Sequence, residues 1–258
     1  MCQFITFCYV RIGTFPLCAG IGLFCICVLV YLQLVNKKVK IETENKIMVC
    51  IPLSVILGIL TAYASDILFR GGIKAFLSTF GYGVTFYGWL LGCIVFLFVY
   101  SQIVNIDSMF LLNLFLPTYS IAQAFGRICC FLGGCCFGCP TKHFGVIYPQ
   151  GSLPYKTFGD TPLFPVQLLE SLYLFLLFVL LFGFVKFRKR AGLYLLLMPA
   201  GRFFFEFLRG DNRGVLLQTY LSPAQIFSLF FLLIGLILFI KSEKEQKILL
   251  GFQKKKEE

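Results

Sequence analysis

Residues 124–148 read AFGRICCFLGGCCFGCPTKHFGVIY, and this stretch determines how the rest of the chain is interpreted. It holds Arg127 inside an apolar run, together with five cysteines and a Gly-Gly pair. A charged side chain at bilayer depth costs about 2.5–3.5 kcal/mol on insertion scales unless it meets a partner or water. Ionisable residues within membrane helices therefore indicate functional sites, and the first question is which groups pair with Arg127.

The composition is that of an integral membrane protein. The 258 residues are 59% hydrophobic and 14% charged, and the mean hydropathy is +0.86. Soluble domains average roughly 45–50% apolar and about 25% charged residues, which excludes that class. The net charge of +11 would suggest nucleic acid for a soluble protein. Here it indicates basic loops held in the cytoplasm beside anionic lipid, so we expect no nucleic-acid partner.

Seven apolar stretches reach the roughly 17–25 residues that a membrane helix needs. They predict an all-α membrane protein with a single transmembrane domain over residues 1–258, a core at about 14–240 and a basic tail at 241–258. A long loop separates the fourth stretch from the fifth, and the first lacks a signal-peptide cleavage site, so we expect it to be retained. The predicted spans are residues 15–35, 47–69, 82–104, 109–132, 164–185, 192–208 and 219–240.

The distribution of basic residues predicts the orientation. Segments on the side of the C-terminal tail carry twice as many lysines and arginines as segments on the other side. The positive-inside rule then places the N-terminus outside and the C-terminus in the cytoplasm. With this orientation the polar residues of the spans gather near the outer face: Asp66, Tyr87, Arg127, Gln167, Glu170, Arg202, Glu206 and Arg209.

The sixth predicted span carries Arg202, Glu206 and Arg209 at positions i, i+4 and i+7, which share one face of an α-helix. A glutamate between two arginines can neutralise one of them and leave the other to hold an anion. The alternative is a purely structural ladder of ion pairs within the membrane.

Two further groups can serve such a site. Gln167 and Glu170 are spaced i, i+3 and could orient the arginines, or they could only hydrogen-bond neighbouring helices. Tyr87 could belong to the site or to an interfacial aromatic belt. The Gly133-Gly134 pair and Gly138 would let the backbone approach either a lipid headgroup or another helix.

Most of the 12 cysteines lie in or near apolar spans, where a thiol packs as a small hydrophobe. Cys136 and Cys139 form a C-x-x-C, followed by His143, which leaves three alternatives open: packing, a disulfide from Cys135 or Cys136 to Cys139, or a zinc or redox site. Five cysteines form a cluster in this stretch: Cys129, Cys130, Cys135, Cys136 and Cys139. We assign no metal and no cofactor to it.

Four sequence blocks resemble, in order, the motifs of the prolipoprotein diacylglyceryl transferase family. FYGWLLG at 86–92 is similar to F-H-G-G-L-x-G, and GRICCFLGGCCFG at 126–138 to G-R-x-G-N-F-x-N-x-E-x-x-G. FPVQLLE at 164–170 is similar to H-P-x-Q-L-Y-E, and RFFFEFLRGD at 202–211 to R-x-x-x-E-F-x-R-x-P/D. The resemblance covers about residues 14–240, and the last block is its most specific match.

The chain departs from these motifs at several positions. Tyr87 stands where the family has histidine, Cys130 and Gly133 stand at the two asparagines, and Cys135 stands at the glutamate. Phe164 and Leu169 replace a second histidine and a tyrosine. The kept residues are Arg127, Gly138, Gln167, Glu170, Arg202, Glu206 and Arg209.

The resemblance implies transfer of the diacylglyceryl group of phosphatidylglycerol to the cysteine thiol of a prolipoprotein signal peptide. The reaction would take place at the outer leaflet of the bacterial cytoplasmic (inner) membrane and release glycerol phosphate. Arg127 and Arg202 would bind the headgroup, Glu206 would fix Arg202, and Tyr87 would relay the thiol proton. These four are the expected catalytic residues, and the expected substrate-binding residues are Arg127, Cys130, Gly138, Gln167, Glu170 and Arg209.

Three other functions stay open at this point. A non-catalytic or repurposed relative could still bind an anionic lipid headgroup, as the changed histidine and asparagine positions suggest. A membrane thiol or metal protein could use the cysteines of residues 129–139. A transporter is the third alternative, although the sequence has no pair of broken helices in two halves.

Overall fold

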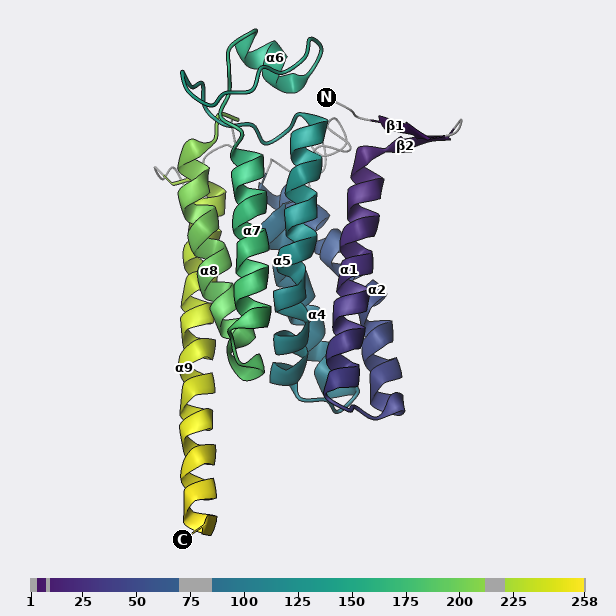
Figure 1. Cartoon of the computed structure of the whole chain (residues 1–258), viewed down its shortest axis with the longest axis vertical. Helices are drawn as coiled ribbons and strands as arrows, with labels where there is room; N and C mark the ends of the chain where they lie inside the picture. The colour runs from purple at the N-terminus through teal and green to yellow at the C-terminus, as the bar shows by residue number, and fades with distance from the viewer. Residues whose placement is uncertain (1–3, 8–9, 70–84, 212–220, 258) are drawn as a thin grey trace. The chain divides into compact units, whose positions relative to one another are not determined.

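The computed structural model describes the backbone of residues 4–7, 10–69, 85–211 and 221–257 (Figure 1). The chain divides into two compact units, which are described separately: a larger unit of residues 1–26 and 116–258, and a smaller unit of residues 27–115. Within the described residues, seven helical stretches are long and apolar enough to cross a membrane. The predicted all-α membrane fold with seven spans is thereby confirmed.

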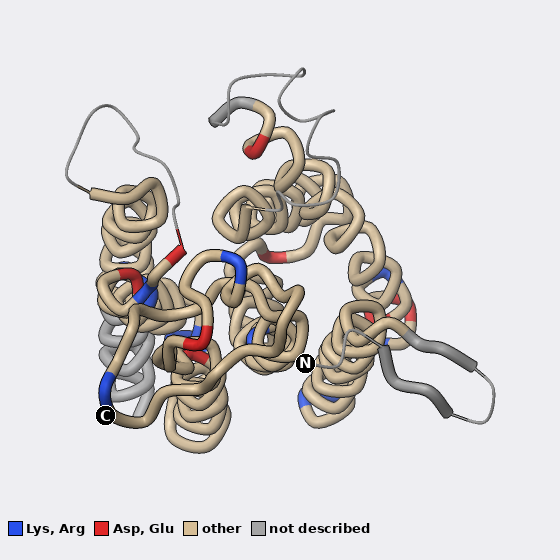
Figure 2. The backbone as a smooth tube through the Cα atoms, turned by 90° about the horizontal axis from the view of Figure 1, so that it is seen from above, with Lys and Arg blue, Asp and Glu red and all other residues tan. Residues whose placement is uncertain are grey.

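Six of the seven long helices lie within six residues of the predicted spans, whereas the last runs to Glu257, through residues that were predicted to form a basic tail. In Figure 2 most of the tube is tan, because few residues are lysine, arginine, aspartate or glutamate, as a membrane environment requires. Short elements flank them: the antiparallel strands β1 (Phe4–Phe7) and β2 (Val10–Gly13), helix α6 (Leu153–Phe158), and 3-10 turns η1 (Phe187–Lys189) and η2 (Glu206–Leu208). The long helices are α1 (Thr14–Asn36), α2 (Ile41–Phe69), α4 (Phe86–Ile103), α5 (Ser108–Gly133), α7 (Val166–Gly183), α8 (Arg190–Phe205) and α9 (Pro223–Glu257).

Some sequence predictions miss details of this arrangement. Helix α2 begins at Ile41, inside a predicted loop, because acidic residues in its first turn and the Glu42–Lys46 ion pair of 2.7 Å favour a helix there. Helix α6 lies in the loop predicted between the fourth and fifth spans. It is capped by Ser152, the residue before its first turn, whose hydroxyl accepts a hydrogen bond from the Tyr155 amide at 3.4 Å. The β1–β2 hairpin was also not predicted.

Several residues used in the predictions lie outside the described part of the chain. These are Tyr82 and Thr219, the predicted first residues of two spans, and the basic loop residues Arg70, Lys74 and Arg213.

Small residues allow α2 and α4 to pack closely in the smaller unit. A Cβ added to Gly88 would lie 1.9 Å from Ser65 Oγ, and a Cβ added to Gly92 would lie 1.9 Å from Thr61 Oγ1. Both hydroxyls donate to backbone carbonyls of α2, so each has a hydrogen-bond acceptor within its own helix. Helix pairs in membranes depend on such close approach because hydrophobic burial no longer drives their association.

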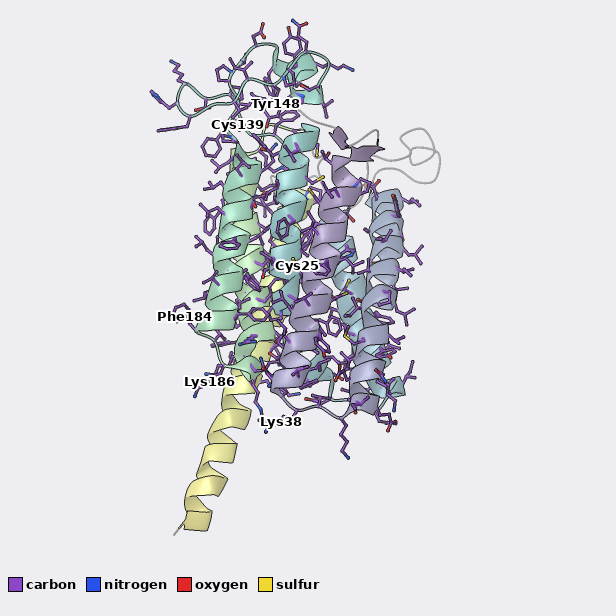
Figure 3. The ribbon with its side chains drawn as sticks, turned by 45° about the vertical axis from the view of Figure 1, so that its right-hand side comes forward. Cys25, Lys38, Cys139, Tyr148, Phe184 and Lys186 are labelled. Atoms are coloured by element: carbon purple, nitrogen blue, oxygen red, sulfur yellow. The ribbon has the colours of Figure 1, made fainter. Side chains whose placement is uncertain are left out.

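In the larger unit, α8 packs against both α7 and α9. A Cβ on Gly201 would lie 2.3 Å from the Tyr173 ring of α7, and a Cβ on Gly235 of α9 would lie 2.6 Å from the carbonyl carbon of Leu195. Helices α7 and α8 are joined by a short turn and are antiparallel, so the first turns of α7 lie beside the last turns of α8. Figure 3 shows the two ends of this unit, with Cys139 and Tyr148 at one and Phe184 and Lys186 at the other.

Candidate functional site

Charged side chains from three helices meet at the Tyr148 end of the larger unit. Glu170, in the first turns of α7, is buried between Arg127 of α5 and Arg202 of α8. Its Oε2 lies 2.7 Å from Arg127 Nε, and its Oε1 accepts a hydrogen bond from Arg202 Nη1. One carboxylate therefore bridges two guanidinium groups on helices that are far apart in sequence, and its single negative charge balances one of the two.

The series of alternating charges continues beyond α8. Glu206 Oε2 lies 3.4 Å from Arg202 Nη2 and 3.9 Å from Arg209 Nε. Arg209 in turn donates from Nε and Nη2 to the two carboxylate oxygens of Asp211, at 2.9 and 2.8 Å. Among the described residues, the site thus balances three arginines against three carboxylates, which lowers the cost of placing charge in this environment.

The predicted spacing of this series is only partly correct. Helix α8 ends at Phe205, and Glu206 begins the 3-10 turn η2, after which Arg209 is extended at φ −85° and ψ 141°. Arg209 therefore reaches Glu206 across a 3-10 turn and does not lie on the same α-helical face as Arg202. The tighter turn lets the chain leave the helix and pair with the preceding loop.

The three arginines of the site differ in their exposure and in how many of their nitrogens contact a carboxylate. Arg127 has the most exposed side chain, at 14%, against 7% for Arg202 and 2% for Arg209. Within the described residues Glu170 is its only ion-pair partner, and the contact uses Nε. Its two terminal nitrogens are therefore placed to bind an anion that enters the site.

Arg209 is more deeply buried than Arg127, but one of its terminal nitrogens also has no hydrogen-bond partner among the described residues. Burial lowers the pKa of Arg209, but the nearby Cys136 sulfur and the Asp211 and Glu170 carboxylates outweigh burial, so the pKa lies above its ordinary value. The group stays charged. Its Nη1 is buried and has no hydrogen-bond partner among the described residues. A buried donor without a partner is costly, which favours an acceptor from a ligand or water at this position.

The loop between α5 and α7 folds back over the site. Gly138 pairs with Arg209 in an antiparallel bridge, in which the Gly210 amide donates to the Phe137 carbonyl at 3.0 Å. On its other side the Phe164 amide donates to the Cys139 carbonyl at 2.9 Å. A small apolar core beneath α6 fixes this loop, and its buried members are Phe137, Tyr148 and Leu163.

Gly138 is required by this close pairing. A Cβ at this position would lie 2.3 Å from the Phe164 carbonyl oxygen and 3.0 Å from that of Leu208. We expect Gly138→Val to separate the two segments and to speed amide hydrogen exchange at Cys139 and Gly210 by at least tenfold, measured by mass spectrometry in detergent. Gly133→Ala is the matched control, because its Cβ would meet nothing within 4 Å. Unchanged exchange in Gly138→Val would contradict the structural role.

Among the described residues, Gln167 hydrogen-bonds the loop and not an arginine. Its Nε2 donates to the Cys135 carbonyl at 2.8 Å and to the Tyr148 hydroxyl at 3.1 Å. Burial raises the pKa of Tyr148, although the hydrogen bond from Gln167 opposes this shift. Sequence reasoning missed Tyr148 because a tyrosine in a long loop gives no signal. It also missed Asp211, which the Arg-x-Asp spacing from Arg209 could have indicated.

The C-x-x-C spacing suggested that Cys136 and Cys139 act together, but the structure groups Cys136 with two other cysteines. The sulfurs of Cys130, Cys135 and Cys136 all lie within 4.8 Å of one another, and each is a thiol. Cys139 instead donates its thiol to the Arg209 carbonyl at 3.1 Å, and His143 is exposed. The predicted substrate residue Cys130 thus belongs to a group of three thiols, which also lies near Arg127.

Tyr87 belongs to the smaller unit, whereas the arginines of the site belong to the larger one. It lies in the first turn of α4, is buried, and contacts Phe86 edge to face at a centroid distance of 5.2 Å. Asp66 of α2 is also buried in this unit. Their relation to the arginines stays a prediction.

The fold and the site are those of a multi-pass membrane protein. Helices of its larger unit bring a cluster of arginines and carboxylates together at one end of that unit, beneath a folded loop. Comparison with known proteins narrows the class. The family model described as prolipoprotein diacylglyceryl transferase matches residues 3–241. The chain belongs to the prolipoprotein diacylglyceryl transferase family.

Relatives named phosphatidylglycerol–prolipoprotein diacylglyceryl transferase share about a third of the aligned residues. The protein of Clostridium tetani is 36% identical over 168 residues, covering 63% of this chain and 66% of the relative. Enzyme 2 of Clostridium perfringens is 35% identical over 175 residues, covering 64% and 66%. A protein of Dehalococcoides mccartyi is 31% identical over 177 residues, covering 65% and 64%. The chain thus matches slightly less than two thirds of the length of each of these relatives.

Proposed function

We propose that this protein transfers the diacylglyceryl group of phosphatidylglycerol to the cysteine thiol of a prolipoprotein. The family and the names of the relatives suggest the reaction. The observation that carries the proposal is the bridge from Arg127 through Glu170 to Arg202. It holds two guanidinium groups in place before any substrate arrives, and guanidinium is the side-chain group best shaped for phosphate.

The arginines act on the charge that develops in the reaction. The substrate sulfur attacks the glyceryl carbon that carries the phosphate ester, the S–C bond forms, and the C–O bond breaks. Glycerol phosphate leaves with the electron pair, so negative charge grows on the phosphate oxygens. Preorganised donors in a site shielded from water stabilise such charge far better than solvent does. Arg127 contacts the phosphate through its terminal nitrogens, while Glu170 and Glu206 keep Arg202 in position.

The remaining expected residues take supporting roles in this proposal. Gln167 and Gly138 shape the loop that covers the headgroup, and Arg209 offers its uncommitted Nη1 to the phosphate or glycerol oxygens. The thiol proton must leave during the reaction. Tyr87 stands where the family has histidine and would relay this proton.

The site is proposed to face the outer leaflet of the bacterial inner membrane. In the larger unit, the opposite end of α7 and α8 carries a basic group formed by Lys186, Arg188, Lys189 and Arg190. Basic segments stay in the cytoplasm, so the arginine–carboxylate cluster lies toward the exterior. A prolipoprotein signal peptide would reach it there from within the membrane.

A reconstituted assay tests the proposed activity. Purified protein in phosphatidylglycerol vesicles is incubated with a synthetic signal peptide that carries one cysteine. We expect a peptide mass increased by one diacylglyceryl group, and glycerol phosphate as the second product. A serine peptide and vesicles of phosphatidylcholine are the controls, and both should give no product. Absence of thioether from the cysteine peptide in phosphatidylglycerol would contradict the proposal.

A second function is favoured by one observation, namely that Tyr87 and Cys130 replace the histidine and an asparagine of the family motifs. A relative with these changes could bind an anionic headgroup without transferring it. The same vesicles separate the two functions. Retention of phosphatidylglycerol by the purified protein, with no thioether formed, would support this second function.

A further inference from the structure

Three thiols gather at the end of α5 through a specific turn of the backbone. The Cys135 amide donates to the Cys130 carbonyl at 3.0 Å, and Gly134 takes a positive φ of 68°, which closes the helix. Cys136 also has a positive φ, of 58°, a conformation that costs a non-glycine residue energy. The turn returns the sulfurs of Cys135 and Cys136 to within 4.8 Å of the sulfur of Cys130.

The spacing of these sulfurs suits a thiophilic metal ion. Zinc–sulfur bonds are about 2.3 Å long, so tetrahedral geometry places neighbouring sulfurs about 3.8 Å apart. The three sulfurs therefore need to move by about 1 Å or less to share one ion. Gln167 holds the Cys135 carbonyl at 2.8 Å, which keeps the turn in place while the side chains rotate.

The surrounding charge also favours such an ion. Three thiolates around a divalent cation carry one net negative charge. Arg127 lies near the sulfurs of Cys130 and Cys136, and Arg209 lies near the sulfur of Cys136. Two guanidinium groups next to the site thus offset the extra charge, in the way that outer groups commonly stabilise metal centres.

The site is open on one side. Cys135 is exposed, while Cys130 and Cys136 are half-buried. In the part of the chain that the structure describes, no histidine, carboxylate or further cysteine joins this group of three. Structural zinc sites are closed by four protein ligands, whereas three protein ligands leave a position for a water or a substrate. The accessible side is therefore where a fourth ligand would bind.

We propose that Cys130, Cys135 and Cys136 bind a thiophilic divalent cation such as Zn²⁺, and that its fourth position receives the cysteine thiol of the prolipoprotein. This inference rests on the transfer function proposed above, and it replaces the expectation that the cysteine cluster holds no metal. A thiol that coordinates such an ion loses its proton, which the Tyr87 relay proposed above would pass on to solvent. The bound sulfur keeps its electron pair and forms the S–C bond while the C–O bond of the lipid breaks. The metal is neither oxidised nor reduced.

The first experiment measures metal binding without reference to activity. Purified full-length protein is loaded with Zn²⁺ and desalted, and its metal content is measured by elemental analysis. We expect one ion per chain, and at least a tenfold loss of affinity in Cys130→Ser, Cys135→Ser and Cys136→Ser. Cys139→Ser is the matched control from the same loop, because serine can keep the hydrogen bond to the Arg209 carbonyl. Circular dichroism confirms that each variant is folded.

Two results of this experiment would overturn the proposal. One is wild-type protein that retains no Zn²⁺ after desalting. The other is equal affinity in the wild type and in all three folded serine variants of the thiol group.

The second experiment tests the fourth ligand and separates this proposal from the transfer function. Co²⁺ replaces Zn²⁺, and the thiolate-to-cobalt absorption band is followed as peptide is added. The cysteine peptide should change the band and the serine peptide should not, also in Arg202→Ala, a variant of a headgroup-binding arginine in which transfer is expected to fail. Chelation should reduce transfer at least tenfold, and Zn²⁺ should restore it.

The outcomes are distinguishable. Undiminished transfer by metal-free protein would overturn the metal's role and leave the transferase intact. Metal and thiol binding without any thioether would support the metal site and contradict the transfer function.

Discussion

Replacing Arg127 with alanine should reduce diacylglyceryl transfer by about 10²–10³-fold, the usual cost of removing one preorganised donor from a developing anion. Arg127 is the most exposed arginine of the site, and Glu170 holds it through Nε alone. Its terminal nitrogens are therefore the donors best placed for the phosphate. The measurement is the rate of thioether formation in phosphatidylglycerol vesicles, with the same amount of inserted protein for each variant.

Two variants make the result specific. Arg127→Lys keeps the charge but loses the fork of two terminal nitrogens, so we expect activity between that of the wild type and Arg127→Ala. Arg188→Ala removes an arginine from the opposite end of the larger unit, in η1, and should leave transfer unchanged. Full activity in Arg127→Ala would remove Arg127 from the proposed mechanism.

Glu170→Ala should have a large effect on both stability and transfer. The Glu170 carboxylate contacts Arg127 and Arg202, and its loss leaves two poorly exposed guanidinium groups without this shared counterion. Breaking a buried ion pair by removing one partner costs about 3–5 kcal/mol. We expect a clearly lower midpoint of thermal unfolding in detergent, and loss of transfer in whatever protein remains folded.

Leu169→Ala is the control for this prediction, since Leu169 is the neighbouring residue on α7 and is exposed. It should keep both the unfolding midpoint and the activity. The double variant Glu170→Ala with Arg127→Ala should be destabilised by less than the sum of the single variants, because the two residues interact directly. Simple additivity would show that the pair contributes little to stability.

The sequence was sufficient to predict the membrane fold and much of the charged site. Spans of the right length and strong apolar character leave few alternatives, so the seven helices were found with shifts of a few residues. Arg127, Glu170, Arg202 and Glu206 were also predicted together. Each is an ionisable side chain in an otherwise apolar segment, and the cost of burying such a charge requires an opposite partner nearby.

Other parts of the site depend on tertiary contacts that a sequence does not display. Glu170 rather than Gln167 was found to hold the arginines, because the choice depends on the rotation of α7 about its axis. The C-x-x-C spacing suggested Cys136 and Cys139 as partners. A positive φ at Cys136 and the pairing of Gly138 with Arg209 direct their sulfurs to different neighbours.

The sharing of Glu170 between α5 and α8 has a consequence for biogenesis. Arg127 leaves the ribosome well before the glutamate that neutralises it, and Arg202 leaves later still. We therefore expect the α5 segment to insert less efficiently on its own, before α7 is synthesised. Membrane integration of α5 should thus depend on the downstream hairpin of α7 and α8.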